Sequence, residues 1–292
     1  MRRRRYTKLL KVLGIICFLV FFMFPIYWLV LTSLKMPGDI TASPVVWFTT
    51  NLSLDNYRLL FGYAGKLWGQ EEYVGRSFLP AITPYLFNSI TVGIVSSAIA
   101  TLLGSFLAYG VLVFGFGEKR LYNWLLSLRM IPPVVVAIPM FMIFRSLRLI
   151  DNPWSLVIAY LMINMPFATL LLFGFMRDIP KEIGEAAVLD GCSSFAAFFR
   201  LMVPLTAPGM TAVFIISFLM CWNELLLANA LTTTTNAQTF PVYTTNFSQV
   251  ERGTAWGPAA AGGVIGIVPM LISSLYIQKY LVRGLTLGAV KG

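Results

Sequence analysis

Six long runs of apolar residues constrain the fold of this chain more than any other feature of its sequence. A helix needs about 20 mainly apolar residues to cross the hydrocarbon core of a bilayer, and hydrocarbon offers no water to unpaired backbone amides. The runs therefore predict closed transmembrane helices and an all-α fold, organised as one polytopic membrane domain over residues 1–292. The expected spans are residues 12–34, 86–114, 121–144, 154–175, 209–231 and 259–280.

The composition also excludes a soluble domain, because 58% of the residues are hydrophobic, only 12% are charged and the mean hydropathy is +0.77. The first apolar run follows a basic N-terminal stretch and could be mistaken for a signal peptide. It exceeds the roughly 7–15 residues of a typical signal-peptide core, and no small-residue cleavage site follows. An uncleaved signal anchor is the better interpretation.

The distribution of lysine and arginine predicts the orientation. Fourteen of the 22 basic residues lie on the side of the two termini, seven lie in the alternate loops, and Arg129 falls within the third span. Basic loops stay in the cytoplasm, so both termini are expected there. The net charge of +10 is then mainly an orientation signal, and no folded soluble basic face supports binding to nucleic acid.

Several kinds of chemistry are excluded by the residues that are missing. The chain has no histidine, and its three cysteines, Cys17, Cys192 and Cys221, are widely separated, so neither a metal site nor a disulfide framework is expected. No glycine-rich loop ending in Gly-Lys-Ser/Thr is present to hold nucleotide phosphates, and no serine lies beside a plausible base. We expect no catalytic residue and no bound cofactor; if ATP and Mg²⁺ drive this protein, a separate partner chain binds them.

The cytoplasmic loop over residues 177–208 is longer than a connector needs to be and is amphipathic. Pro180 can open a helix, Glu182 suits its positive end, and Gly191 permits a turn before a second helix. One apolar face of that second helix is spaced at i, i+3, i+4 and i+7: Phe195, Phe198, Phe199 and Met202. The loop is therefore predicted to be a short helix, a bend and a second helix. It could dock on a partner protein, or it could lie in the membrane interface with its phenylalanines in lipid.

A motif in this loop resembles a known family. Glu185-Ala186-Ala187 is followed after three residues by Gly191, and after nine more by Leu201, one residue, Val203 and Pro204. This spacing resembles the EAA loop of ABC importer permeases, in which isoleucine and leucine stand at the positions of Leu201 and Val203. Both departures are aliphatic exchanges.

The resemblance implies a fold, partners and residue roles. The fold would be that of a type I ABC importer permease in a bacterial inner membrane, paired with a second permease subunit above two ATPase subunits. An extracytoplasmic binding protein would deliver the solute. Ala186 and Ala187 would face outwards to lodge in a cleft of the ATPase, with Glu185 and Asp190 as polar anchors.

Further features resemble the smaller permease subunit of the maltose-type subfamily. These are the number of spans, a first outer segment of about fifty residues, and the C-terminal stretch from Arg283 to Gly292. The resemblance implies a sugar or oligosaccharide as solute, and an outer loop over residues 232–258 that approaches the binding protein. Its aromatic residues, Tyr243, Phe247 and Trp256, would suit stacking on sugar, or would simply belong to a solvated loop.

Polar residues inside the predicted spans are the other candidate site, because burying an amide or a charge in hydrocarbon is unfavourable without a partner or a wet cavity. Asn164, Asn223, Glu224 and Arg129 could line a translocation pathway. Alternatively, the amides and the carboxylate could bond a neighbouring helix, and Arg129 could extend towards the cytoplasmic surface.

Two other functions remain open at this stage. An ABC permease for a non-sugar solute would carry a similar loop. A secondary transporter independent of ATP should show internal repeats and paired ionisable residues at the midplane. No clear repeat is visible, and Glu224 is the only acidic residue deep within a span.

Overall fold

The computed structural model describes residues 2–63, 79–115, 117–249 and 253–288, and these form two compact units. The first comprises Met1–Ile82 and Thr244–Val268, and the second comprises Thr83–Tyr243 and Pro269–Gly292. The expected single domain over residues 1–292 stays a prediction. Part of the loop over residues 232–258 and the last four residues of the C-terminal stretch lie outside the described residues.

Among the described helices, five are long and apolar enough to cross a membrane, or six if the bent pair α5 and α6 counts as one span. The predicted all-α fold is confirmed. The strands of the described part are limited to a two-residue antiparallel pair, β1 (Ser248–Gln249) with β2 (Gly253–Thr254).

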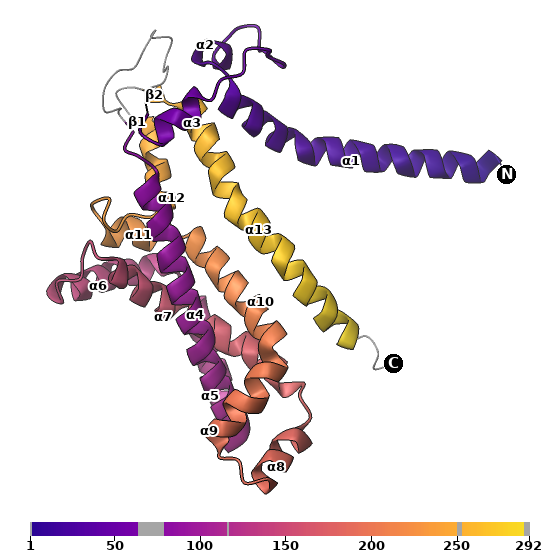
Figure 1. Cartoon of the computed structure of the whole chain (residues 1–292), viewed down its shortest axis with the longest axis vertical. Coiled ribbons are helices and arrows are strands. Elements are labelled where there is room, and N and C mark those ends of the chain that lie inside the picture. Colours follow the sequence, from indigo (N-terminus) through magenta and orange to yellow (C-terminus); the bar gives the residue numbers. More distant parts are fainter. Residues whose placement is uncertain (1, 64–78, 116, 250–252, 289–292) are drawn as a thin grey trace. The chain divides into compact units, whose positions relative to one another are not determined.

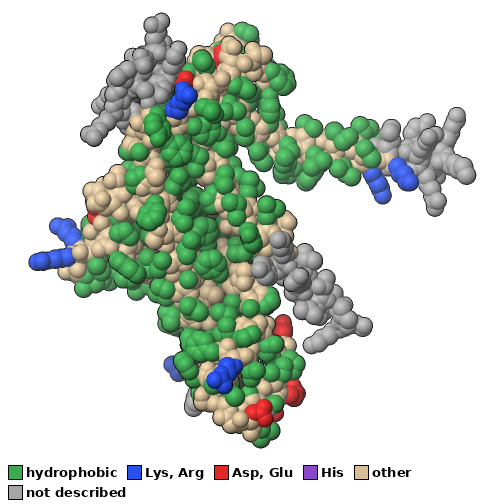
Figure 2. Space-filling view, in the orientation of Figure 1, with side chains coloured by type: hydrophobic (Ala, Val, Ile, Leu, Met, Phe, Trp, Pro, Cys, Tyr) green, Lys and Arg blue, Asp and Glu red, His purple; other side chains and the backbone are tan. Residues whose placement is uncertain are grey.

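The first unit is built around the C-terminal end of α1 (Arg2–Leu34). Figure 2 shows hydrophobic side chains over the described length of this helix, as expected for a helix without a polar face. Short helices α2 (Pro37–Ile40) and α3 (Asp55–Leu60) follow. Buried Asn56 of α3 donates to the carbonyls of Ser33 and Lys35, at 3.0 Å each, and so ties α3 to the chain where α1 ends.

Lys35 is buried in this unit, which is unusual for a lysine. Its ammonium lies 4.2 Å from the centre of the Trp28 ring and donates to the carbonyl of Val46. A cation placed just after a helix C-terminus is favoured by the helix dipole. Lys35 therefore stabilises the end of α1.

The second unit has a core of three long helices that lie side by side: α4 (Thr83–Phe114), α7 (Pro153–Arg177) and α10 (Val203–Trp222) (Figure 1). The buried face of α4 is made of small residues, including Gly93, Ser97, Thr101 and Ser105 at every fourth position. A Cβ atom on Gly104 would lie 3.0 Å from the backbone nitrogen of Thr169, so the α4 and α7 backbones approach closely. Small residues permit such close packing of membrane helices.

The third predicted span, residues 121–144, is not one straight helix. It is divided between α5 (Glu118–Met130) and α6 (Pro133–Ser146), whose axes differ by 90°. Prolines have no N–H and disfavour the helical conformation in the residue before them, and Ile131 accordingly adopts extended backbone angles before Pro132 and Pro133.

The fifth predicted span, residues 209–231, is also interrupted. Helix α10 begins at Val203 and ends at Trp222, and α11 (Leu226–Leu231) resumes after three residues. The remaining helices are α8 (Lys181–Leu189), α9 (Ser194–Ala197), the π-helix η1 (Phe198–Met202), α12 (Phe240–Thr244), the 3₁₀ helix η2 (Thr245–Phe247) and α13 (Trp256–Gly288).

Candidate functional site

The predicted helix, bend and second helix of the loop over residues 177–208 are all present. Helix α8 starts after Pro180 and ends at Leu189, two residues before a left-handed Gly191 whose φ is +79°. The amide of Cys192 donates to the carbonyl of Ala187 at 2.9 Å, which closes the helix end in a Schellman arrangement. The glycine therefore sets the bend by supplying a conformation that other residues adopt at a cost.

The second part of the loop is anchored to α4 by aromatic rings. Phe198 is buried, its ring centre is 4.2 Å from that of Phe106, and it also contacts Tyr109 at 5.2 Å. The Tyr109 hydroxyl donates to the carbonyl of Ser194 at 3.1 Å. Ser193 caps α9 by accepting from the amide of Ala196. The central phenylalanine of the predicted apolar face thus packs on protein, whereas Phe195 remains largely exposed.

The outer surface of α8 is acidic and small. Glu182, Glu185, Ala186 and Asp190 are exposed, and Figure 2 shows acidic side chains gathered in this region. Ala187 is only 5% exposed, so the prediction that Ala186 and Ala187 both face outwards is wrong for Ala187. Successive residues of a helix point about 100° apart, so two neighbouring alanines cannot share the centre of one face.

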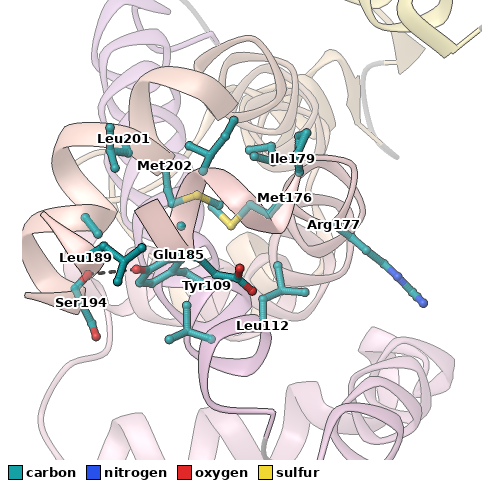
Figure 3. Close-up of a pocket in the computed structure, with 15 residues that line it drawn as sticks. Tyr109, Leu112, Met176, Arg177, Ile179, Glu185, Leu189, Ser194, Leu201 and Met202 are labelled. Carbon is teal, nitrogen blue, oxygen red and sulfur yellow. Dashed lines mark hydrogen bonds between the residues drawn. The ribbon is translucent and has the colours of Figure 1, made fainter. Parts of the chain in front are cut away.

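A cavity of about 660 Å³ lies between α8 and the ends of α4 and α7. Glu185 lines this cavity and is also exposed to solvent, whereas Arg177 extends away from it (Figure 3). Arg177 instead pairs with Glu118 at 3.7 Å, an exposed pair of small energetic value. The residues that line the cavity are mainly apolar: Tyr109, Leu112, Val113, Met176, Arg177, Ile179, Pro180, Ile183, Gly184, Glu185, Leu189, Ser194, Ala197, Leu201 and Met202.

Of the predicted polar residues within the spans, Glu224 closes the break between α10 and α11. Its two carboxylate oxygens accept hydrogen bonds from the amides of Leu227 at 2.8 Å and Ala228 at 3.1 Å. A carboxylate suits the positive end of a helix and satisfies amides that have no partner within it. Tyr160 of α7 donates to the Glu224 carbonyl at 3.5 Å, which adds a contact with the core.

Asn164 and Asn223 lie in different surroundings. Asn164 is 2% exposed and donates to the Cys221 sulfur at 3.0 Å, and that sulfur also lies 3.3 Å from the Ser96 hydroxyl. Asn223 is exposed, and its side chain donates to the carbonyl of Leu219 at 2.8 Å. The structure therefore brings Asn164 into the contact between α4, α7 and α10 and leaves Asn223 on a surface.

The far end of α11 is held by a residue that the sequence analysis did not single out. Asp151, in the turn before α7, accepts from the amides of Thr233 and Thr234 and from the Thr234 hydroxyl, at 2.6–2.9 Å. Its own amide donates to the carbonyl of Leu231, the last residue of α11. Burial raises the pKa of the Asp151 carboxyl, but the hydrogen bonds from Thr234 and Thr233 outweigh it and leave the pKa below its ordinary value.

Residues 100–287 match the family described as the binding-protein-dependent transport system inner membrane component. The chain belongs to this family. The matched range contains the whole EAA loop and both interrupted helices, so the loop motif and the family assignment agree.

Relatives of this binding-protein-dependent permease are similar over almost their full length. It is 33% identical to the diacetylchitobiose uptake system permease protein DasC of Streptomyces coelicolor, covering 92% of both chains. It is 35% identical to the trehalose transport system permease protein SugB of Mycobacterium tuberculosis, again covering 92% of both. The chain is therefore an inner membrane, multi-pass transport component.

The fold of the permease is also found in a crystal structure of a bacterial ABC transporter that imports the acidic polysaccharide alginate. The two chains align with a TM-score of 0.70 at 18% identity, covering 96% of this chain and 98% of that one. This structural alignment confirms the predicted type I permease fold.

Proposed function

We propose that this permease is one of two membrane subunits of an ATP-driven importer, and that it forms half of the translocation pathway. The observation that carries the proposal is the exposed surface at the end of α8 formed by Glu185, Ala186 and Asp190. This surface is held by a glycine bend and an aromatic anchor on α4. Such a helix presents a fixed surface to a partner, and movement of the partner would be transmitted to the core through Phe198 and Phe106.

In this proposal the partner below α8 is a dimer of ATPase subunits, which bind ATP and Mg²⁺. Glu185, Ala186 and Asp190 contact the ATPase, and Gly191 fixes their orientation. Ala187 packs on the permease itself, and Pro204 lies in the first turn of α10. The permease is a transport subunit and not an enzyme, with both termini in the cytoplasm and its outer helices in lipid.

The proposed solute is a saccharide delivered by an extracytoplasmic binding protein. The names of the relatives DasC and SugB, which refer to diacetylchitobiose and trehalose, support this class. Among the predicted pathway residues, exposed Asn223 is the best placed to contact a solute. Glu224 shapes the pathway by capping α11, and the burial of Asn164 supports a position behind its wall.

Affinity purification of the tagged chain from solubilised membranes tests the proposal. We expect it to co-purify with a second permease and an ATPase, and ATP hydrolysis by the reconstituted complex should rise when a saccharide-loaded binding protein is added. A chain that purifies alone and transports solute into liposomes without ATP would contradict the proposal.

A further inference from the structure

Arg129 lies beside the middle of the long apolar helix α7, where its guanidinium contacts Phe167. It lies eleven residues after Glu118 in α5, and Phe167 lies ten residues before Arg177 in α7. Glu118 and Arg177 form an ion pair and so mark one end of both helices. At 1.5 Å per residue, Arg129 is about 16.5 Å and Phe167 about 15 Å from that end, close to half the thickness of a bilayer core of about 30 Å.

The guanidinium itself stays at this depth. Its central carbon lies 4.9 Å from the centre of the Phe167 ring, so the side chain does not extend to the cytoplasmic surface. The side chain is exposed on the second unit. The two ion pairs found among the described residues, Arg58 with Asp55 and Arg177 with Glu118, do not include it. A cation at this depth requires a counter-charge or water.

The backbone carbonyl of Arg129 also requires a partner or water, for a separate reason. In a continuous helix the carbonyl of Arg129 would accept from residue 133, but Pro133 has no N–H. None of the hydrogen bonds found among the described residues supplies another donor. The adjoining Met130 is 82% exposed. Interrupted backbone at membrane depth is tolerated only where it is buried in protein or lines a water-filled cavity.

We propose that Arg129 and the open end of α5 line the water-filled translocation pathway, and that Arg129 binds an anionic group of the transported saccharide. This inference rests on the proposed function. Phe167 covers one face of the guanidinium, while the in-plane N–H groups, which pair with no acidic side chain of the described residues, can hold a carboxylate, sulfonate or phosphate with two hydrogen bonds.

An acidic saccharide supplies both the counter-charge and the hydrogen-bond donor that this site requires. Its anionic group neutralises the guanidinium, and its hydroxyl groups donate to the carbonyl that the prolines leave open. A carboxylate of the second permease would answer only the first demand, because it has no proton to donate. The geometry therefore favours the solute as the source of the anion.

ATP-driven uptake by the complete importer, reconstituted in liposomes with its binding protein, tests this assignment. The probes are a disaccharide that contains glucuronate and the matching disaccharide of glucose. We expect uptake of the acidic disaccharide by the wild type and a loss of at least about tenfold in Arg129→Gln, with partial activity in Arg129→Lys. Arg145→Gln, which removes an exposed charge from α6, is the matched control and should leave uptake within about twofold.

The other outcomes are distinguishable. An assembled, ATP-driven importer that carries only the neutral disaccharide, or that loses both disaccharides equally in Arg129→Gln, would overturn the assignment but leave the proposed function intact. Loss of the second permease from purified Arg129→Gln would also overturn it, because the arginine would then pair with that subunit. Failure of the wild-type chain to assemble with an ATPase would instead contradict the proposed function.

Discussion

At the break between α10 and α11, the chain's own groups satisfy the backbone hydrogen bonds. At the break between α5 and α6, the described residues leave a backbone carbonyl without a donor. At the first break, Glu224 caps α11, Asn223 donates to Leu219, and Tyr160 donates to the Glu224 carbonyl. At the second, prolines remove the donors, and Arg129 has no acidic partner in the part of the chain that the structure describes. An interruption whose backbone groups are bonded within the chain has a structural role. One whose backbone groups are not bonded within the chain requires water or a ligand.

Straightening the open break should have the largest effect. The double variant Pro132→Ala, Pro133→Ala restores two N–H donors and favours a continuous helix by about 3 kcal/mol per residue. We expect the variant to assemble but to lose ATP-driven uptake, because the bend and its open carbonyl disappear. Pro139→Ala, which replaces a proline inside α6, is the control. Normal uptake by the double variant would show that the bend has no part in transport.

Removing the cap from the closed break should come next. Glu224→Ala leaves the amides of Leu227 and Ala228 without acceptors, at about 1–3 kcal/mol for each donor left unpaired in a buried site. The thermal midpoint of the purified complex should fall. Glu224→Gln keeps one acceptor oxygen, so its thermal midpoint should fall less than that of Glu224→Ala. Equal midpoints for wild type and Glu224→Ala would mean that the carboxylate does not close this break.

A smaller effect is expected at Asn164, which lies behind the closed break. Its amide donates to Cys221, but its oxygen is buried and accepts no hydrogen bond from any residue that the structure describes. Asn164→Leu removes one hydrogen bond, which destabilises the fold, and one buried unsatisfied oxygen, which stabilises it. Because the two effects oppose each other, the free energy of unfolding should change by less than about 1 kcal/mol. Uptake should remain within about threefold of wild type. A specific loss of solute uptake in this variant, with a normal thermal midpoint, would place Asn164 on the pathway wall instead.

The smallest effect at neutral pH is expected from Asp151, which holds the far end of α11. Hydrogen bonds from the threonines lower its pKa below the ordinary value of 3.8, although burial opposes them. The stabilisation is therefore complete well above pH 3.8 and is lost as the pH falls through the lower pKa of the folded protein.

Asp151→Asn should accordingly flatten the dependence of the thermal midpoint on pH in the acid range. Asp178→Asn, beside the loop at the other end of the unit, is the control and should keep the wild-type profile. An unchanged acid profile in Asp151→Asn would show that the threonine bonds do not persist in solution.

The sequence predicted the helical class, the apolar segments and the helix–bend–helix form of the loop over residues 177–208, because apolar length and motif spacing are local properties. The division of the third span could be anticipated in part from Pro132 and Pro133, although its 90° angle depends on how α6 packs against α11. The inward position of Ala187 depends on how α8 is rotated about its axis, and the motif does not specify that rotation.

Contacts between distant segments could not be predicted. Phe106 anchors Phe198 from 92 positions earlier in the chain, and its own neighbourhood reads as an ordinary apolar span. Asp151 lies in an Asp-Asn-Pro turn that signals a loop but not the threonines that it binds. The polar residues of the spans were recognised by their chemistry, whereas their exposure, and hence their role, depends on the packing of three helices.

The most direct test of the account is the ratio of solute imported to ATP hydrolysed by the reconstituted importer, compared between Glu185→Lys and Glu182→Lys. Both glutamates are exposed on α8, but only Glu185 belongs to the motif proposed to contact the ATPase. We predict that Glu185→Lys lowers this ratio or releases the ATPase, while Glu182→Lys behaves as wild type. Equal, wild-type ratios in both variants would contradict a coupling role for α8.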